Sequence, residues 1–221
     1  MLLQRLVEYL APAECLMCGQ EGALICSECQ DQAIITKTPT CYRCNRLSTG
    51  WKVCATCRHY TQLLRVVVAS HYDGSVQEVI KALKYRQAVA AGDIAAAWLA
   101  PKLHASEFDL VIPVPSAPGR ERQRGYNQAA VIARSLAQQL DLPYLVTLGR
   151  TGETHQVGRS RAERLQQLKG AFYIRNRALL EQAHVLLVDD VVTTGATLSE
   201  CATVLKQAGA KHVSGAVIAK H

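Results

Sequence analysis

The sequence lacks any apolar run long enough to cross a bilayer, and its first ten residues lack the uninterrupted apolar stretch of a signal peptide. It also lacks low-complexity segments. Its hydrophobic content of 49% and its mean hydropathy near zero are typical of a globular chain and not of a disordered one. These absences argue against a membrane-spanning or secreted protein, so we expect a cytoplasmic location and no membrane span.

A large charge excess is also missing. The formal net charge of +7 would by itself suggest acidic partners such as phosphates or nucleic acid. If eight cysteines bind two zinc ions, their thiolates and the two ions together reduce this charge to about +3. The remaining basic excess is too modest to establish nucleic-acid binding.

Cysteine is abundant, and it is concentrated in one part of the chain. Eight of the nine cysteines precede residue 58 and form four pairs with two residues between the members. Two such turns supply the four soft ligands of a closed tetrahedral zinc site. The predicted ligands are Cys15, Cys18, Cys26, Cys29, Cys41, Cys44, Cys54 and Cys57. We therefore predict a double zinc-ribbon or knuckle module over residues 1–62, which holds two structural zinc ions and folds with their help.

These cysteines have other interpretations. A disulfide framework is typical of secreted proteins, and a redox pair usually occurs once beside a βαβ unit. Four successive pairs without a signal peptide favour zinc. Sequential pairing, first with second and third with fourth, is the simplest, while an interleaved arrangement is also open. The basic and aromatic side chains of the module either contact nucleic acid or form a solvated surface around a small metal core.

Residues 63–221 alternate apolar runs with amphipathic segments. The predicted strands cover residues 66–72, 110–114, 144–148, 185–189 and 213–219. Helical spacing places Val76, Val79, Ile80 and Leu83 on one face, and Ile132, Leu136 and Leu140 on another. A further helix is expected from about Ala196 to Gly209, with Cys201 buried in the core. This pattern predicts a doubly wound, mostly parallel α/β sheet, whose ligands bind beyond the carboxyl ends of its strands.

The segment from Val185 to Thr197 carries the strongest sign of a ligand. A buried strand leads into Asp189 and Asp190, and a loop rich in threonine with Gly195 then opens a helix. The N–H groups of a helix N-terminus and the threonine hydroxyls suit a phosphate, whereas the two carboxylates suit the hydroxyls of a vicinal diol. The alternative is an ordinary strand–turn–helix with an Asp N-cap, but one acid would serve that purpose. The sequence therefore predicts a sugar-phosphate site.

The acidic segment resembles the phosphoribosyl-diphosphate (PRPP) motif of type I phosphoribosyltransferases, and the whole chain resembles the ComF family of competence and DNA-utilisation proteins. Four features carry the second resemblance, in order along the chain. The first two are the cysteine pairs and residues 83–86 (Leu-Lys-Tyr-Arg). The third is residues 112–115 (Ile-Pro-Val-Pro) with Arg120, Arg122, Arg124 and residues 125–128 (Gly-Tyr-Asn-Gln), and the fourth is residues 154–156 (Thr-His-Gln) with Arg161, Arg164 and residues 169–172. One position departs from the family pattern, because Gln167 stands where an Asn is expected.

The resemblance implies PRPP binding with Mg²⁺. It assigns the ligand to Asp189, Asp190, Val191, Val192, Thr193, Thr194, Gly195, Ala196 and Thr197, together with Lys84, Pro115, Ser116, Arg120, Arg124 and Arg161. The turn-rich loop over residues 114–120 would face the pyrophosphate, and the basic stretch over residues 149–169 would close over the ligand. Asp189 and Asp190 are the predicted catalytic residues, with Asp190 as a general base.

Three functions fit these expectations. The first is an active phosphoribosyltransferase on an unidentified acceptor. The second is a DNA-uptake factor that uses PRPP as a ligand, with the zinc module binding single-stranded DNA or DNA-translocation proteins. The third is a non-catalytic adaptor. Salt-dependent binding to single strands separates the second from the others, and pyrophosphate release on addition of an acceptor identifies the first.

Overall fold

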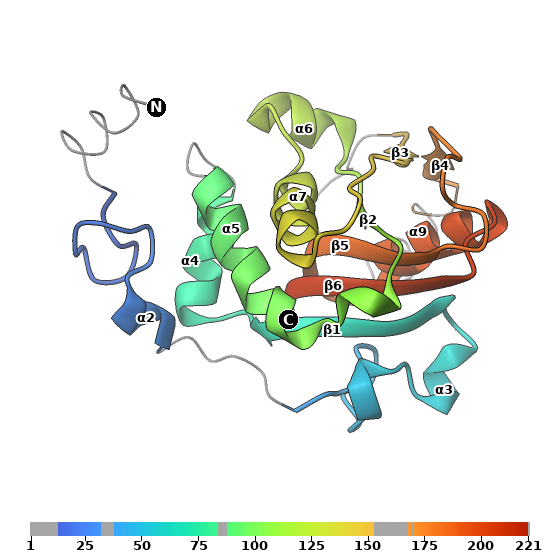
Figure 1. The fold of residues 1–221 in the computed structure, drawn as a ribbon, viewed down its shortest axis with the longest axis horizontal. Helices are drawn as coiled ribbons and strands as arrows, with labels where there is room; N and C mark the ends of the chain where they lie inside the picture. Colours follow the sequence, from blue (N-terminus) through green and yellow to red (C-terminus); the bar gives the residue numbers. More distant parts are fainter. Residues whose placement is uncertain (1–12, 32–37, 84–87, 153–167, 169, 221) are drawn as a thin grey trace.

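The centre of the molecule is a four-stranded parallel sheet in the order β1-β6-β5-β2 (Figure 1). The computed structural model describes residues 13–31, 38–83, 88–152, 168 and 170–220. Its sheet consists of β1 (Leu63–His71), β2 (Leu110–Pro113), β5 (His184–Val192) and β6 (His212–Lys220). Successive residues of β5 and β6 are buried, because layers cover both faces of the sheet. The predicted doubly wound α/β class is confirmed.

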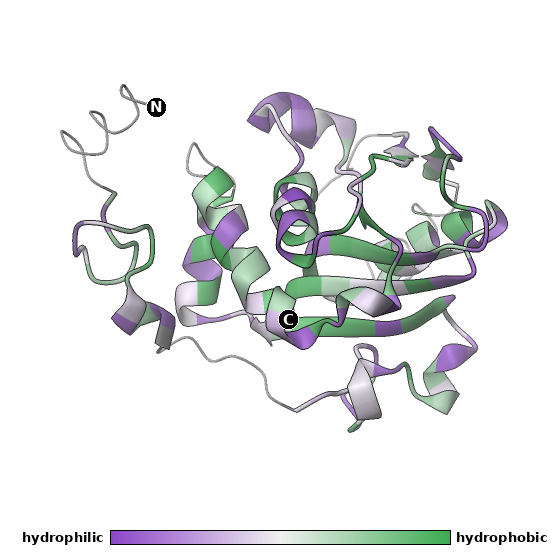
Figure 2. Ribbon diagram, in the orientation of Figure 1, coloured by the Kyte–Doolittle hydropathy of each residue, from purple (hydrophilic) through white to green (hydrophobic). Residues whose placement is uncertain are grey.

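Helices form both outer layers. The helices of this part of the chain are α4 (Gly74–Ala82), α5 (Ala88–Leu99), α7 (Gln128–Leu140) and α9 (Ala196–Gln207), together with α6 (Pro118–Arg124), which lies beyond the end of the sheet (Figure 1). Short 3-10 turns lie at Thr49–Trp51, Ala100–Lys102 and Ala105–Glu107. Helices α5 and α7 pack against each other on one face of the sheet, while α9 packs on the other (Figure 1). Figure 2 shows the apolar character of β5 and β6 and the strongly polar α6. The predicted apolar faces are confirmed, since Val79 and Ile132 are fully buried, as is Cys201.

The strand predicted at residues 144–148 is wrong. The backbone of Val111 exchanges two hydrogen bonds with residues 143 and 145, and the chain then leaves the sheet. The next residue on that edge of β2 is Pro113, which has no N–H with which to continue the ladder. The chain instead forms β3 (Leu148–Arg150), which pairs antiparallel with β4 (Phe172–Ile174) in a second, small sheet that was not predicted.

Two further boundaries differ from the expectation. The loop predicted over residues 114–120 ends early, because helix α6 already begins at Pro118. Proline is well tolerated in the first turn of a helix, where its missing N–H would have no partner. Strand β5 continues to Val192 and does not end at residue 189, so the acid pair lies within the strand.

The cysteine-rich part of the chain forms two separate modules (Figure 1). The first covers residues 13–31 and contains α2 (Ser27–Asp31); the second covers residues 38–62 and contains α3 (Ala55–Arg58). The N–H of Val53 donates to the carbonyl of Leu64 at 3.0 Å, beside a bridge between Lys52 and Arg65. The second module is thus hydrogen-bonded to the first residues of β1. In the part of the chain that the structure describes, no helix is long and apolar enough to cross a membrane.

Candidate functional site

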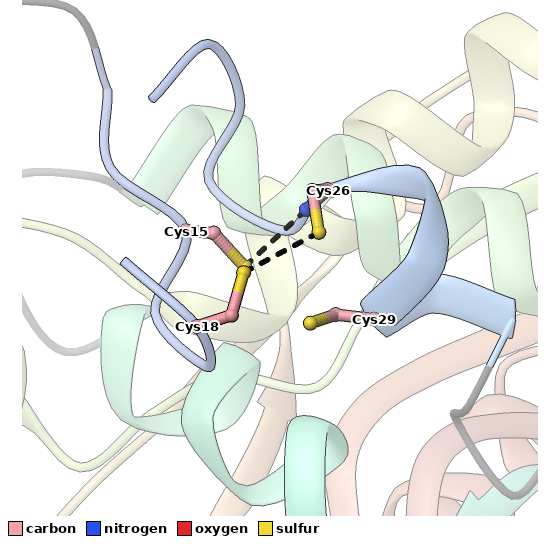
Figure 3. Close-up of side chains that lie close together, drawn as sticks. All are labelled: Cys15, Cys18, Cys26 and Cys29. Carbon is pink, nitrogen blue, oxygen red and sulfur yellow. Dashed lines mark hydrogen bonds between the residues drawn. The ribbon is translucent and has the colours of Figure 1, made fainter. Parts of the chain in front are cut away.

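The eight N-terminal cysteines form two clusters, and the sequential pairing is confirmed. One cluster comprises Cys15, Cys18, Cys26 and Cys29, and the other comprises Cys41, Cys44, Cys54 and Cys57. The side chains of the first cluster converge from a turn and the start of α2 (Figure 3). Within each cluster all sulfur atoms lie within 4.8 Å of one another, and one sulfur pair in each lies 3.6 Å apart. Four thiolates at about 2.3 Å from one zinc ion are separated by about 3.8 Å, so both clusters could hold zinc.

Backbone N–H groups prepare each cluster for a metal ion. The N–H of Cys26 lies 3.4 Å from the sulfur of Cys15 and lowers the pKa of that thiol to about 6. Burial opposes the ionisation of Cys41, but hydrogen bonds from the N–H groups of Cys54, Arg43 and Cys44 act in the opposite direction, and its pKa is lowered to about 6 as well. Burial and the neighbouring sulfurs raise the pKa of Cys57 to about 12. A metal ion must therefore displace protons from some thiols of each cluster.

The acid pair lies where the sheet opens. Strand β2 ends at Pro113, opposite Val188, and β5 continues beyond that point with only β6 beside it. The carboxylate of Asp189 accepts the N–H of Asp190 at 2.9 Å, and the carboxylate of Asp190 accepts the N–H of Val191 at 2.7 Å. Both acids line a cleft beside the part of β5 that β2 leaves uncovered.

The surroundings of Asp189 disfavour the ionised form of its carboxyl group. Its side chain keeps some exposed surface, but many protein atoms surround it. Burial first, and the neighbouring charge of Asp190 second, raise its pKa well above the ordinary value, while the guanidinium of Arg150 acts in the opposite direction. An acid in a cleft whose pKa is raised in this way is typical of a functional site.

A small pocket follows the acid pair, lined by Asp189, Val191, Val192, Thr193, Thr194, Gly195, Ala196, Thr197 and Leu198. Gly195 caps α9 with a φ of 73°, a left-handed conformation that glycine adopts without strain. The N–H of Ala196 donates to the Thr194 hydroxyl at 3.3 Å. The pocket combines threonine hydroxyls with the N-terminus of a helix, which is the donor set expected for a phosphate group.

A larger cleft of about 190 Å³ adjoins the small pocket, and the two share Asp189, Val191 and Thr197. The cleft brings together four predicted residues that are distant from the acids in sequence, namely Pro115, Ser116, Arg120 and Arg124, and it also includes Asp190. Two other predicted residues, Lys84 and Arg161, lie outside the described residues, as do Arg164, Gln167 and the motif at residues 154–156.

Two polar cleft residues lie in segments that were named from the sequence, but they were not among the predicted ligand residues. Arg150 ends β3 beside Asp189, and Gln128 begins α7 with only 7% of its surface exposed. The Nε of Arg150 and the Nε2 of Gln128 are buried and have no hydrogen-bond partner among the residues that the structure describes. Buried donors without an acceptor are costly, so these two atoms are suited to an anion or another polar ligand that enters the cleft. The basic stretch over residues 149–169 included Arg150, but no sequence pattern indicated that Arg150 ends a strand beside the acid pair.

The motif at residues 125–128 organises the wall of the cleft. The hydroxyl of Tyr126 donates to the carbonyl of Leu83 at 2.6 Å and thereby joins the end of α6 to the end of α4. The amide of Asn127 donates to the carbonyl of Val114 at 2.8 Å, while its oxygen accepts the N–H of Ala129 at 3.1 Å and caps α7. These contacts fix the loop after β2 relative to the start of α7.

Comparisons with known proteins agree with this geometry. Residues 127–221 match the phosphoribosyl transferase domain family. The chain is 31% identical to Competence protein F of Haemophilus influenzae over 86% of this chain and 87% of that protein. The chain belongs to the ComF family. Other ComF-family relatives are DNA utilization protein YhgH of Escherichia coli K12, at 30% identity over 91% of this chain and 94% of that protein, and Competence protein ComFC of Streptococcus pneumoniae R6, at 25% over 90% and 96%.

The ComF-family assignment extends across both parts of the chain. The matches to Competence protein F and YhgH span 86% and 91% of the chain, whereas the domain family covers only the part from residue 127 onward. A solved purine phosphoribosyltransferase from Pyrococcus horikoshii is 25% identical over 58% of this chain and 73% of its own, with a TM-score of 0.39. The domain-family match and the two cysteine clusters together show that this ComF-family chain combines a phosphoribosyltransferase-type sheet with two clusters that could hold zinc.

Proposed function

We propose that the cleft binds PRPP with Mg²⁺ and that the protein serves the uptake or use of external DNA. The observation that carries the first half is a pair of adjoining pockets that share Asp189, the larger of which also includes Asp190. One pocket has the donors of a phosphate site, and the other has arginines and orphaned donors. A ligand with a phosphate at one end, a diol in the middle and a diphosphate at the other end matches this order of groups.

The two ends of PRPP would bind differently. The 5′-phosphate would accept hydrogen bonds from the Thr193 to Thr197 loop and the N-terminus of α9. The diphosphate would lie in the larger cleft, near Arg120, Arg124 and Arg150. Planar guanidinium groups bind such oxygens in pairs, and the diphosphate would give the Nε of Arg150 the acceptor it lacks among the described residues.

The acid pair would bind the ribose between the two phosphate groups. Asp189 and Asp190 accept hydrogen bonds from vicinal hydroxyls, and Mg²⁺ would be held largely by ligand oxygens and water. The magnesium ion would neutralise charge on the diphosphate as it leaves the anomeric carbon. We propose the same two acids as the catalytic residues, with Asp190 as a general base for an acceptor.

The DNA half of the proposal rests on the family and on one surface of the second module. Relatives are named for competence and DNA utilisation. The ring of Tyr60 is 67% exposed, and the guanidinium of Arg43 lies 5.2 Å from its centre. An exposed aromatic ring beside a cation is suited to stacking with an unpaired base. We therefore propose single-stranded DNA as a partner, together with DNA-translocation proteins, and a cytoplasmic location.

Calorimetric titration of the zinc-loaded protein with PRPP and Mg²⁺ tests the ligand. The wild type should bind at micromolar concentrations, and Asp189→Asn combined with Asp190→Asn should lose at least about tenfold in affinity, or about 1.4 kcal/mol. Asp141→Asn, at the exposed end of α7, is the matched control and should bind like the wild type. Absence of binding by a folded wild-type protein, or equal binding by the double variant, would contradict the proposal.

A further inference from the structure

A residue of the second cysteine cluster's turn packs against the Thr193 to Thr197 loop, which we call the phosphate loop. Tyr42 follows the buried Cys41 directly and is itself only 1% exposed. A Cβ atom added to Gly195 would lie 2.0 Å from Cε2 and 2.8 Å from Cδ2 of the Tyr42 ring. The ring therefore occupies the space that a side chain at residue 195 would need. The Thr193 to Thr197 loop lines the small pocket, whereas the ring of Tyr42 contacts this loop and is not among the residues that line the pocket.

Two other contacts hold the module in this position. The hydroxyl of Ser199, one turn into α9, donates to the carbonyl of Tyr60 at 3.3 Å. The ammonium group of Lys220, at the end of β6, donates to the side chain of Asn45. The module is thus joined to the helix that the phosphate loop opens and to the strand that runs beside β5. Cys41 and Cys44 would be zinc ligands on either side of Tyr42 and would fix the turn that carries the ring.

We propose that Tyr42 is a positioning residue for the phosphate loop, and that zinc in the second cluster sets the phosphate affinity of the site by holding Tyr42 against Gly195. This inference rests on the proposed function, since it assigns the supported loop to the 5′-phosphate of PRPP. Its physical basis is the conformation of Gly195. A glycine at a φ of 73° has many other conformations available, and only the correct one directs the N–H groups at the start of α9 toward a single anion.

A rigid loop binds more tightly because less conformational freedom is lost when the ligand binds. The ring of Tyr42 limits the loop before the ligand arrives. If zinc leaves the second cluster, the turn with Tyr42 loses its constraint and Gly195 gains alternative conformations. We expect no such effect from the first cluster, because none of the hydrogen bonds described for residues 13–31 reaches the Thr193 to Thr197 loop.

The test compares Tyr42→Leu with Tyr42→Phe and with Phe108→Leu. Tyr42→Leu keeps an apolar side chain but removes the ring, whereas Tyr42→Phe keeps the ring. Phe108 is also buried, at 6% exposure, but it precedes β2 at the opposite end of the strand from the cleft. In titrations with PRPP and Mg²⁺, Tyr42→Leu should bind about tenfold more weakly. Tyr42→Phe and Phe108→Leu should bind within about twofold of the wild type.

Amide hydrogen exchange without PRPP gives an independent result. Residues 194–198 should exchange faster in Tyr42→Leu than in the wild type, Tyr42→Phe or Phe108→Leu. The role of zinc is tested with Cys44→Ser against Cys18→Ser, since both residues are the exposed second member of a first pair in their cluster. Only Cys44→Ser should accelerate exchange at residues 194–198. These measurements also decide the matter if Tyr42→Leu is too unstable to titrate.

The outcomes separate this inference from the function on which it rests. If the folded wild type does not bind PRPP, the proposed function fails, and the exchange measurements still decide whether Tyr42 fixes the loop. If the wild type binds and Tyr42→Leu binds equally well with unchanged exchange, the inference is overturned. Equal weakening by Tyr42→Leu and Phe108→Leu would show general destabilisation and would overturn it too. Equal effects of Cys44→Ser and Cys18→Ser would overturn the role of zinc in the second cluster.

Discussion

The two cysteine modules have nearly the same turn but different surroundings. In the first, the N–H of Gly19 donates to the carbonyl of Cys15 at 2.8 Å, and in the second the N–H of Asn45 donates to Cys41 at 2.9 Å. Each turn is closed by one antiparallel bridge, between Glu14 and Glu21 or between Thr40 and Leu47. The residue after the first cysteine is the half-buried Leu16 in one module and the buried Tyr42 in the other.

This difference shows that similar metal clusters need not have similar roles. Both modules place side chains in the core, Ile25 from the first and Tyr42 and Trp51 from the second, but the second module also forms hydrogen bonds with β1, α9 and β6. The hydrogen bonds described for the first module stay within it. We therefore propose that the second module belongs mechanically to the sheet domain, although the boundary predicted from the sequence follows residue 62. We expect that a partner protein or nucleic acid that contacts the first module would leave the ligand site unchanged.

The largest expected effect comes from removing one zinc ligand in each module. Cys41→Ser and Cys15→Ser should each lower the zinc content by about one ion per chain. Cys41→Ser should also lower the free energy of unfolding of the sheet domain by about 3–5 kcal/mol, the scale for losing a buried aromatic side chain, because Tyr42 and Trp51 lose their packing. Cys15→Ser should change it by less than 1 kcal/mol. Urea denaturation followed by circular dichroism measures both, and equal losses would remove the distinction between the modules.

A smaller effect is expected at the site beside the second module. The raised pKa of Asp189 means that the folded protein binds this proton more tightly than the unfolded chain does. Stability is therefore lost as the pH rises above the unfolded value of about 3.9 and through the folded pKa. Asp189→Asn should be more stable than the wild type at pH 7, and the difference should shrink toward pH 4.

Urea midpoints across this pH range measure that difference, with Asp141→Asn as the exposed control that should show little change. If Asp189→Asn is less stable than the wild type at pH 7, the interactions of the Asp189 carboxylate stabilise the folded protein. In that case the surroundings of Asp189 would stabilise its ionised form, contrary to the raised pKa.

The smallest effect concerns the matching turn positions, Gly19 and Asn45. Both have positive φ, 74° and 62°, but only the amide of Asn45 accepts a hydrogen bond from Lys220. Asn45→Gly should cost about 0.5–1 kcal/mol, because the hydrogen bond is lost while the backbone conformation is kept. Gly19→Asn should be nearly neutral, since asparagine tolerates this conformation. The same urea measurements resolve both, and a larger loss from Gly19→Asn would reverse the comparison.

Much of this arrangement was predictable from the sequence, because it depends on local patterns. The four cysteine pairs, the apolar runs of β5 and β6 and the acid–threonine segment have short-range signatures. The clustering of Pro115, Ser116, Arg120 and Arg124 with the acids follows from parallel strands that end at one edge. The ligand roles of all these residues stay predictions.

The remaining features depend on long-range contacts. No local pattern indicates that Tyr42 reaches Gly195, because 153 residues separate them and only the docking of the second module brings them together. The resemblance assigned Gly195 to the ligand site, and the structure adds a second reason for a glycine there, because the ring of Tyr42 leaves no room for a side chain. Strands β3 and β4 were missed for a similar cause, since their pairing joins segments on either side of residues 153–167.

A crystal structure of the zinc-loaded protein with PRPP and Mg²⁺ tests the central claim most directly. The account predicts the 5′-phosphate at Thr193 to Thr197 with Gly195 against Tyr42, the ribose hydroxyls at Asp189 and Asp190, and the diphosphate within reach of Arg120, Arg124 and Arg150. A ligand bound in the reverse direction or away from the acid pair would contradict it.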